Sequence, residues 1–281
     1  MKKKIIIAAS VLLVLAAVAA AVILLPKDKK PERYVSFIDV GQGDCILLSD
    51  GEKNVMVDCG TLDSGVKLSE YLDFKGIDSL DCLVLTHPHS DHCGGLGKVT
   101  AGVEVGLVLT NGEKSENNGY NSVLESLERT GVPVKSPACG EKYLFGDIEL
   151  LFLGPAGDHK EENERSLVVM ATLDGVKYLL MGDCSGEAET ELVRKWEDGL
   201  RCDVLKVGHH GSSDATGEEL LGAARPAFAV VSCGKNNDYG HPHTKTLERI
   251  SAFDVRLFRT YDYMNALTFY AGDNDLKYIG E

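Results

Sequence analysis

Three histidines and one aspartate lie within six residues of this 281-residue chain: His87, His89, Asp91 and His92. They directly follow the apolar run Leu83–Leu85, which is typical of a buried strand, and a glycine pair comes soon after them. Neutral imidazoles and carboxylates are the ligands that zinc and similar divalent ions prefer. The alternative is a solvated polar loop, but histidines are mostly scattered along such loops rather than clustered. The cluster therefore predicts a metal site in a loop at the carboxyl end of a strand.

Two later segments also place polar groups just beyond apolar strands. Asp183 follows the run Lys177–Met181 and a glycine, and the pair His209 and His210 follows Asp203–Val207. A carboxylate in such a position suits two cations, because each oxygen can face a different ion and offset their mutual repulsion. Two adjacent histidines point to opposite sides and both need partners, which disfavours a purely structural role for the pair.

The order His-x-His-x-Asp-His resembles the signature of the metallo-β-lactamase superfamily. The turn Asp39–Asp44, with the sequence Asp-Val-Gly-Gln-Gly-Asp, is similar to that of the ComEC-type branch, named for the soluble C-terminal domain of the competence DNA-uptake channel. The same branch resembles secreted phosphorylcholine esterases. The resemblance extends from about Tyr34 to about Tyr270. It implies an α/β fold, the αββα sandwich, with the ligands at one edge of both sheets.

By this resemblance the site holds two divalent metal ions, with Zn²⁺ as the expected metal. The ligands of the first ion are His87, His89 and Asp183, completed by water or substrate. The ligands of the second ion are Asp91, His92, Asp183 and His209. His209 is preferred over the adjacent His210, and Asp58 is expected to orient the ligands by hydrogen bonds rather than to bind metal.

The resemblance also implies a substrate side. There the branch carries a Tyr-Gly-His-Pro-His stretch, which here is Tyr239–His243. His243 could donate to a phosphate or protonate a leaving group, and helix capping or surface packing is the alternative. Catalytic roles are expected for Asp91, His210 and His243. Substrate contacts are expected for Gln42, Asp44, His210, His241 and His243.

One departure from the superfamily affects the metal. Many members have a further metal-binding histidine before the Gly-Asp motif, whereas the one histidine between His92 and Asp183 is His159, inside the charged loop 157–165. That loop resembles no ligand motif, so His159 is expected to be solvated. A site with fewer nitrogen ligands could admit Mn²⁺ as well as Zn²⁺.

The N-terminus predicts a membrane segment. Lys2–Lys4 precede the uncharged run Ile5–Leu25, which Pro26 and further lysines close. As a helix this run spans roughly 31 Å, enough to cross a hydrocarbon core, whereas a cleavable signal peptide usually has an apolar region of about 7–15 residues. Residues 1–30 are therefore predicted to be an anchor, with a signal peptide as the alternative, and residues 31–281 the hydrolase domain. The basic start predicts that this domain lies outside the cell membrane, or is secreted if the segment is cleaved.

Charge and cysteine usage limit the partners. The net charge of −14 repels phosphate backbones, so nucleic acid is expected as a substrate at most, without tight non-specific binding. The 8 cysteines lack the spacing of a disulfide framework, although free thiols fit an extracytoplasmic location poorly. Cys93 follows His92 directly and could approach the metals, with a buried thiol as the alternative.

These observations predict a metal-dependent hydrolase that uses a hydroxide activated by two metal ions. Phosphodiesters are the favoured substrates, either in nucleic acid or in phosphorylcholine-type cell-surface groups. The alternative is a lactone, thioester or β-lactam hydrolase of the same fold. A non-enzymatic anchored binding module is a third hypothesis, which the complete ligand set disfavours. The oligomeric state is left open.

Overall fold

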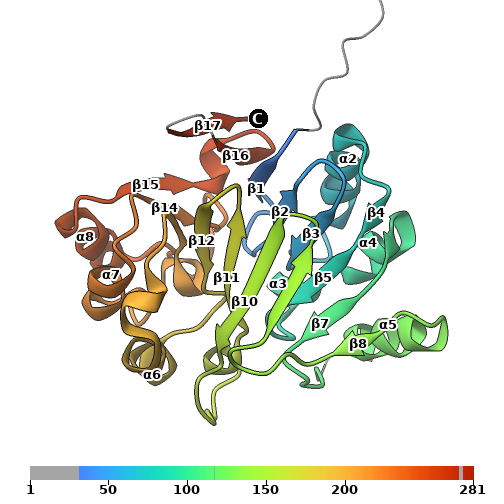
Figure 1. Cartoon of the computed structure of the whole chain (residues 1–281), viewed down its shortest axis with the longest axis horizontal. Coiled ribbons are helices and arrows are strands. Elements are labelled where there is room, and N and C mark those ends of the chain that lie inside the picture. Colours follow the sequence, from blue (N-terminus) through green and yellow to red (C-terminus); the bar gives the residue numbers. More distant parts are fainter. Residues whose placement is uncertain (1–31, 117, 272–274) are drawn as a thin grey trace, which may run out of the picture. The chain divides into compact units, whose positions relative to one another are not determined.

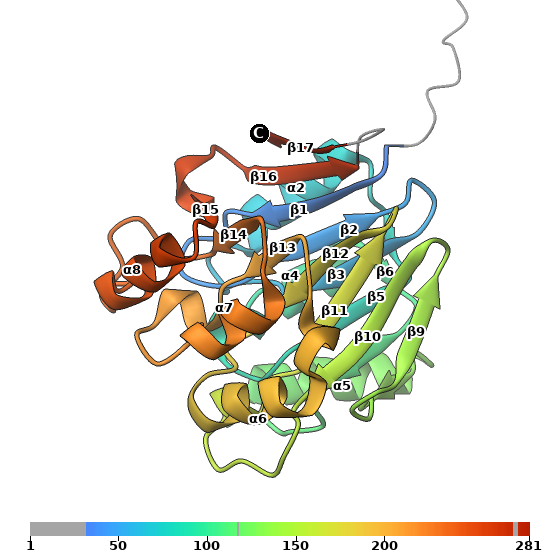
Figure 2. The same ribbon diagram turned by 60° about the vertical axis from the view of Figure 1, so that its left-hand side comes forward.

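Two β-sheets packed face to face form the centre of the fold, and helices cover both outer faces (Figures 1 and 2). The computed structural model describes residues 32–116, 118–271 and 275–281. Buried side chains from both sheets meet in one core between them, and a second and a third core lie between each sheet and its helices. This arrangement confirms the predicted αββα sandwich.

The first sheet has 8 strands and carries the loop with the histidine cluster. Its strand order is β17 (Leu276–Gly280), β16 (Ala266–Ala271), β1 (Tyr34–Ile38), β2 (Ile46–Ser49), β3 (Asn54–Val57), β5 (Cys82–Leu85), β7 (Val108–Thr110) and β8 (Val134–Lys135). From β3 to β8 neighbouring strands are parallel. A small two-stranded sheet pairs β4 (Ser79–Leu80) with β6 (Glu104–Val105).

The second sheet has 7 strands and carries the later ligand loops. Its order is β15 (Arg256–Arg259), β14 (Phe228–Val231), β13 (Val204–Lys206), β12 (Val176–Leu180), β11 (Val168–Leu173), β10 (Ile148–Gly154) and β9 (Lys142–Phe145). Strands β12, β13, β14 and β15 are parallel, so their carboxyl ends lie at one edge of the sheet. Open sheets of this kind bind ligands outside the carboxyl ends of their strands.

Each outer face has its own helices. On the first sheet lie α2 (Gly65–Lys75), α3 (Ser90–Cys93), α4 (Leu96–Gly102) and α5 (Asn118–Arg129). On the second lie α6 (Gly186–Trp196), α7 (Glu218–Ala224) and α8 (Thr244–Ala252). The described residues also contain short 3₁₀ helices: η1 (Asn163–Arg165), η2 (Glu197–Leu200), η3 (Gly208–Gly211) and η4 (Thr260–Asp262).

Covering both faces of the sheets explains the apolar runs in the sequence. In β5, Cys82 and Val84 face the core between the sheets, whereas Leu83 and Leu85 face the helices. Successive side chains of a strand point to opposite faces, so a strand buried on both sides is apolar throughout.

The predicted membrane segment, Ile5–Leu25, lies outside the described residues. Within the part that the structure describes, no helix is long and apolar enough to cross a membrane.

Candidate metal centre

The side chains that could bind metal come from loops that follow three strands in two different sheets. His87, His89, Asp91 and His92 lie between β5 and the start of α4, Asp183 follows β12, and His210 lies in η3 after β13. The carboxyl ends of these strands meet where the two sheets face each other. The fold therefore brings together residues that are more than a hundred positions apart in the chain.

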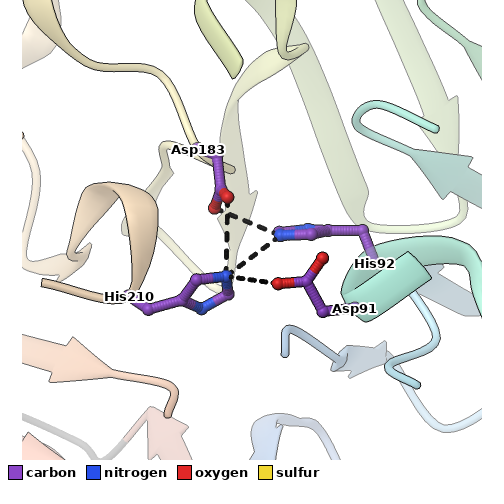
Figure 3. Close-up of side chains that lie close together, drawn as sticks. All are labelled: Asp91, His92, Asp183 and His210. Carbon is purple, nitrogen blue, oxygen red and sulfur yellow. Dashed lines mark hydrogen bonds and ion pairs between the residues drawn. The ribbon is translucent and has the colours of Figure 1, made fainter. Parts of the chain in front are cut away.

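Four side chains form the first group: Asp91, His92, Asp183 and His210 (Figure 3). Their ligand atoms all lie within 4.8 Å of one another. The Nε2 atom of His92 lies 3.1 Å from Asp183 Oδ1, and the Nε2 atom of His210 lies 3.1 Å from Asp91 Oδ2. The two Nε2 atoms are 3.3 Å apart, so both imidazoles point to the same place between the carboxylates.

A second group contains His87, His89 and Asp183, again within 4.8 Å. The buried Nε2 atom of His87 has no hydrogen-bond partner and lies 3.8 Å from Asp183 Oδ2. Leaving such buried polar atoms unpaired costs about 1–3 kcal/mol each, which a bound cation would offset. The residues present therefore fit two divalent cations that share Asp183.

The pKa values follow from the burial of these charges. Burial and the neighbouring His92 hold the pKa of His87 well below its usual value. Burial also acts to lower the pKa values of His92 and His210, but the carboxylates around them together outweigh it. Asp183, with Asp58 beside His92 and with Asp44 and Asp91 beside His210, raises both pKa values well above the usual value. Burial opposes ionisation of Asp183, yet His210 and His92 bring its pKa well below the ordinary range. The centre thus favours an ionised Asp183 whose charge needs positive neighbours.

Asp58 forms hydrogen bonds with the loop that carries the metal ligands. Its Oδ2 atom accepts hydrogen bonds from His92 Nδ1 and from the Thr86 hydroxyl, both at 2.7 Å, and its Oδ1 atom accepts one from the Thr86 amide at 2.8 Å. The bond from Nδ1 leaves Nε2 of His92 to face the centre. The orienting hydrogen bonds predicted for Asp58 are therefore present.

The turn Asp39–Asp44 packs directly against the metal loop. The amide of Asp44 donates to the Asp91 carbonyl at 3.1 Å. A Cβ atom at Gly43 would lie 2.2 Å from the same oxygen, so the turn requires glycine at this position.

Asp44 itself lies behind a ligand, contrary to the expected contact with substrate. It is 1% exposed, and its Oδ2 atom forms an ion pair of 2.7 Å with Lys206, which is fully buried. Its Oδ1 atom lies 3.4 Å from Nδ1 of His210, and that nitrogen also lies 2.9 Å from the Ser232 carbonyl. These contacts turn Nε2 of His210 toward the centre, so Asp44 positions His210.

The structure groups His210, rather than the preferred His209, with the metal ligands. The Nε2 atom of His209 lies 3.8 Å from Asp183 Oδ2 and is within hydrogen-bond distance of the Asn163 amide, at 3.2 Å. Both histidines have positive φ angles, 45° and 53°. This left-handed turn directs the second imidazole inward, an orientation that spacing along the chain does not reveal.

His241 lies at the rim of the centre, where substrate contact was predicted. The Gly234 amide donates to Oε1 of Gln42 at 3.1 Å, which leaves the Gln42 amide group to donate to His241 Nδ1 at 3.4 Å. The Nε2 atom of His241 then carries the ring proton. Burial, with His210 nearby, lowers the pKa of His241 to about 4, so its ring is a neutral donor at pH 7.

The environment of His243 does not fit the catalytic role that was expected for it. Its Nδ1 atom accepts a hydrogen bond from the Ser213 amide at 2.9 Å, and its Nε2 atom donates to the Tyr239 carbonyl at 3.1 Å. Both ring nitrogens therefore have backbone partners, and His243 braces the loop that carries Tyr239.

A family model described as the metallo-beta-lactamase superfamily matches residues 38–235. The chain belongs to this superfamily. ComE operon protein 3 of Bacillus subtilis is 34% identical over 249 residues, which are 82% of this chain and 32% of that protein. Competence protein ComA of Neisseria gonorrhoeae is 30% identical over 254 residues, 88% of this chain and 33% of ComA. The chain thus spans about a third of the length of these curated relatives.

The crystal structure of YhfI, a metallo-beta-lactamase fold protein from Bacillus subtilis, has the same fold. It matches with a TM-score of 0.54 at 12% identity, over 81% of this chain and 97% of YhfI.

In place of the further histidine found in many members of the superfamily, the segment before β11 supplies other polar groups. Oε2 of Glu162 lies 2.5 Å from His89 Nε2, which leaves Nδ1 of that ring for a cation. The Ser166 hydroxyl lies 3.3 Å from His87 Nδ1 and 3.2 Å from the Asp183 amide. The Asn163 Oδ1 atom is buried without a hydrogen-bond partner. Neither Glu162 nor Ser166 was predicted, and a serine two residues before a buried strand was the one available signal.

His159, which was expected to be solvated, is buried with 8% exposure. It lies between Glu164 and Glu191, with ring nitrogens 3.7 Å and 3.4 Å from their carboxylate oxygens. The expectation was wrong because these acidic side chains enclose the ring. His159 is in neither ligand group, so it does not replace the further histidine of the superfamily.

Proposed function

We propose that this chain is a metal-dependent phosphodiesterase. The observation that carries the proposal is the position of Asp183 in both ligand groups. When bound, two divalent ions that share a carboxylate activate water as a nucleophile and stabilise the charge that develops on a phosphoryl group. Zn²⁺ suits a set containing imidazoles, and Mn²⁺ is also accommodated because the second group has two histidines and one carboxylate.

The residues of the chain itself hold and orient the substrate. The neutral ring of His241 presents its Nε2–H at the rim of the centre, fixed in that tautomer by Gln42. A donor of this kind binds a phosphoryl or leaving-group oxygen without having to lose a proton at neutral pH. His210 remains a metal ligand in this mechanism and His243 a support for the loop.

Two features favour phosphodiesters over lactones and thioesters. The first is that the centre lacks the further metal-binding histidine that many members of the superfamily have. The second is the similarity of the chain to competence proteins, and this similarity also favours nucleic acid as the source of the phosphodiester. The acidic net charge of −14 fits a short or single-stranded substrate held by the centre better than a long duplex held by its backbone. We further infer that the apolar run Ile5–Leu25 attaches the chain to a membrane, with the site on the extracytoplasmic side.

The test uses the full-length chain and bis(p-nitrophenyl) phosphate, with Zn²⁺ or Mn²⁺ supplied. We expect hydrolysis that requires metal and is lost in Asp183→Asn. The matched control is Asp198→Asn, an exposed carboxylate in η2, which should retain activity. Calorimetry measures metal binding separately, and Asp183→Asn should lower the number of bound ions.

Three outcomes would contradict the proposal. If metal binds but no phosphodiester is cut while a lactone or thioester is hydrolysed, the alternative hydrolase class replaces it. If p-nitrophenyl phosphorylcholine is cleaved far better than an oligonucleotide, nucleic acid is the wrong source. If calorimetry detects no metal, the metal-dependent function itself is wrong.

A further inference from the structure

The exposed aromatic ring of Tyr239 is connected to the metal centre by a row of stacked rings. Tyr239 is 67% exposed, and its ring stacks on His241 with centroids 5.6 Å apart and planes 19° from parallel. His241 stacks in turn on His210, with centroids 6.1 Å apart and planes at 28°. Three rings thus lead from a metal-ligand position to the solvent, and one face of the outermost ring is uncovered.

The loop that carries Tyr239 is fixed by side-chain hydrogen bonds. The Asn237 Oδ1 atom accepts from the amides of Tyr239 and His241, at 3.1 Å and 2.9 Å. Its Nδ2 atom donates to the carbonyls of Gly234 and His241, at 2.8 Å and 2.6 Å. With His243 bound to the Tyr239 carbonyl, the exposed ring is held in place before any ligand arrives. Such preorganisation reduces the entropy lost on binding.

We propose that Tyr239 is a stacking platform for a nucleobase of a single-stranded nucleic-acid substrate whose phosphodiester lies at the metal centre. The inference rests on the proposed phosphodiesterase function and names its substrate class. Every base has a flat π face, so stacking on an aromatic ring binds nucleic acid with little dependence on sequence. It also does not require the basic groove that a chain with net charge −14 is poorly suited to provide.

The shape of this surface favours a base over a quaternary ammonium group. Ammonium ligands such as choline are bound by cages of several aromatic rings. Tyr239 is the one Phe, Tyr or Trp in the segment 234–243, and its inner face is already occupied by His241. A single flat, uncovered face matches a planar base.

The experiment compares two single-stranded oligonucleotides with the same backbone, one of deoxythymidines and one of abasic nucleotides. The full-length chain is assayed with Mn²⁺ as wild type, Tyr239→Ala and Tyr239→Phe. The control is Phe74→Ala, which removes an exposed ring (75%) from α2, in the other helical layer. Methyl p-nitrophenyl phosphate, which has no base, tests the phosphodiesterase function of the wild type separately.

We expect the wild type to have a lower KM for the deoxythymidine strand than for the abasic strand. Tyr239→Ala should raise the KM for the deoxythymidine strand roughly 5- to 150-fold, the range that corresponds to the loss of one base stack. The preference for the deoxythymidine strand over the abasic strand should therefore disappear. Tyr239→Phe and Phe74→Ala should keep it. Equal KM values for the two strands in the wild type, or a preference that survives in Tyr239→Ala, would overturn the platform while cleavage of the methyl ester upholds the phosphodiesterase.

Two further outcomes are informative. If no phosphodiester is cut, fluorescence anisotropy of the labelled deoxythymidine strand still tests the platform, which is overturned if Tyr239→Ala binds as the wild type does. If Tyr239→Ala impairs cleavage of p-nitrophenyl phosphorylcholine but not of the deoxythymidine strand, the ring binds a quaternary ammonium and the proposal is wrong.

Discussion

The side chains of Asp44 and Lys206 form a buried ion pair of 2.7 Å that joins the two sheets directly behind His210. Lys206 lies at the end of β13 in the second sheet, and Asp44 lies just before β2 in the first. Burial disfavours the charge on Asp44, but Lys206 and His210 bring its pKa below the usual value. The pair thus keeps a carboxylate in place against Nδ1 of a metal ligand.

Removing one partner of this ion pair should lower the free energy of unfolding more than removing both partners. Lys206→Met leaves the buried charge on Asp44 without its ion-pair partner, and we expect it to lower the free energy of unfolding by about 3–5 kcal/mol. The double variant Lys206→Met with Asp44→Asn should recover part of that loss, because neither position of the pair then carries a charge. Urea denaturation followed by circular dichroism measures both. A double variant no more stable than Lys206→Met would contradict this account of the pair.

Asp58 should act on metal affinity through His92. Asp58→Ala removes the acceptor for Nδ1, and we expect metal affinity to fall about 10- to 100-fold, the usual effect of losing such a partner. Asp58→Asn should be milder, because an amide oxygen can still accept that hydrogen bond. Calorimetric titration with Zn²⁺ makes the measurement, with Asp198→Asn as the control. Unchanged affinity in Asp58→Ala would show that His92 is held by other contacts.

Much of the centre could be predicted because its histidines and aspartates lie just beyond the ends of apolar strands. His87, Asp91, His92 and Asp183 each follow an apolar run, and parallel strands bring such ends to one edge. The choice between His209 and His210 could not be made in this way, because it depends on two positive φ angles.

Other residues required the packing of distant segments. Lys206 did carry a signal, since a lysine inside an otherwise apolar strand needs a buried partner. Glu162 carried none. Its contact with His89 depends on how the connection from β10 to β11 folds over a loop 73 positions away.

Metal binding should release protons. Asp183 and the other neighbouring carboxylates raise the pKa values of His92 and His210 despite burial, so both rings carry protons at neutral pH in the metal-free centre. His87, with its lowered pKa, is already neutral. A metal ion requires neutral imidazole, so apparent affinity should rise with pH and level off above the raised pKa values. Titrations at one pH in buffers of different ionisation enthalpy count the protons. Identical heats in all buffers would contradict the prediction.

Thiol reactivity should separate one cysteine from the other seven. All eight are free, and every one except Cys139 is buried. Burial raises the pKa of each of the seven, including Cys93, whose value rises to about 12 and whose thiol donates to the Pro88 carbonyl at 3.0 Å rather than facing the metal ligands. Because the thiolate is the reactive form, these seven should be inert in the native protein.

With Ellman's reagent we therefore expect about one thiol to react under native conditions and all eight after denaturation. Cys139→Ser should remove the native reaction and leave seven thiols in the unfolded chain. Prompt reaction of several thiols in that variant would show that the cores open readily. Fewer thiols than expected in denaturant without a reducing agent would show that some form disulfides, as an extracytoplasmic location favours.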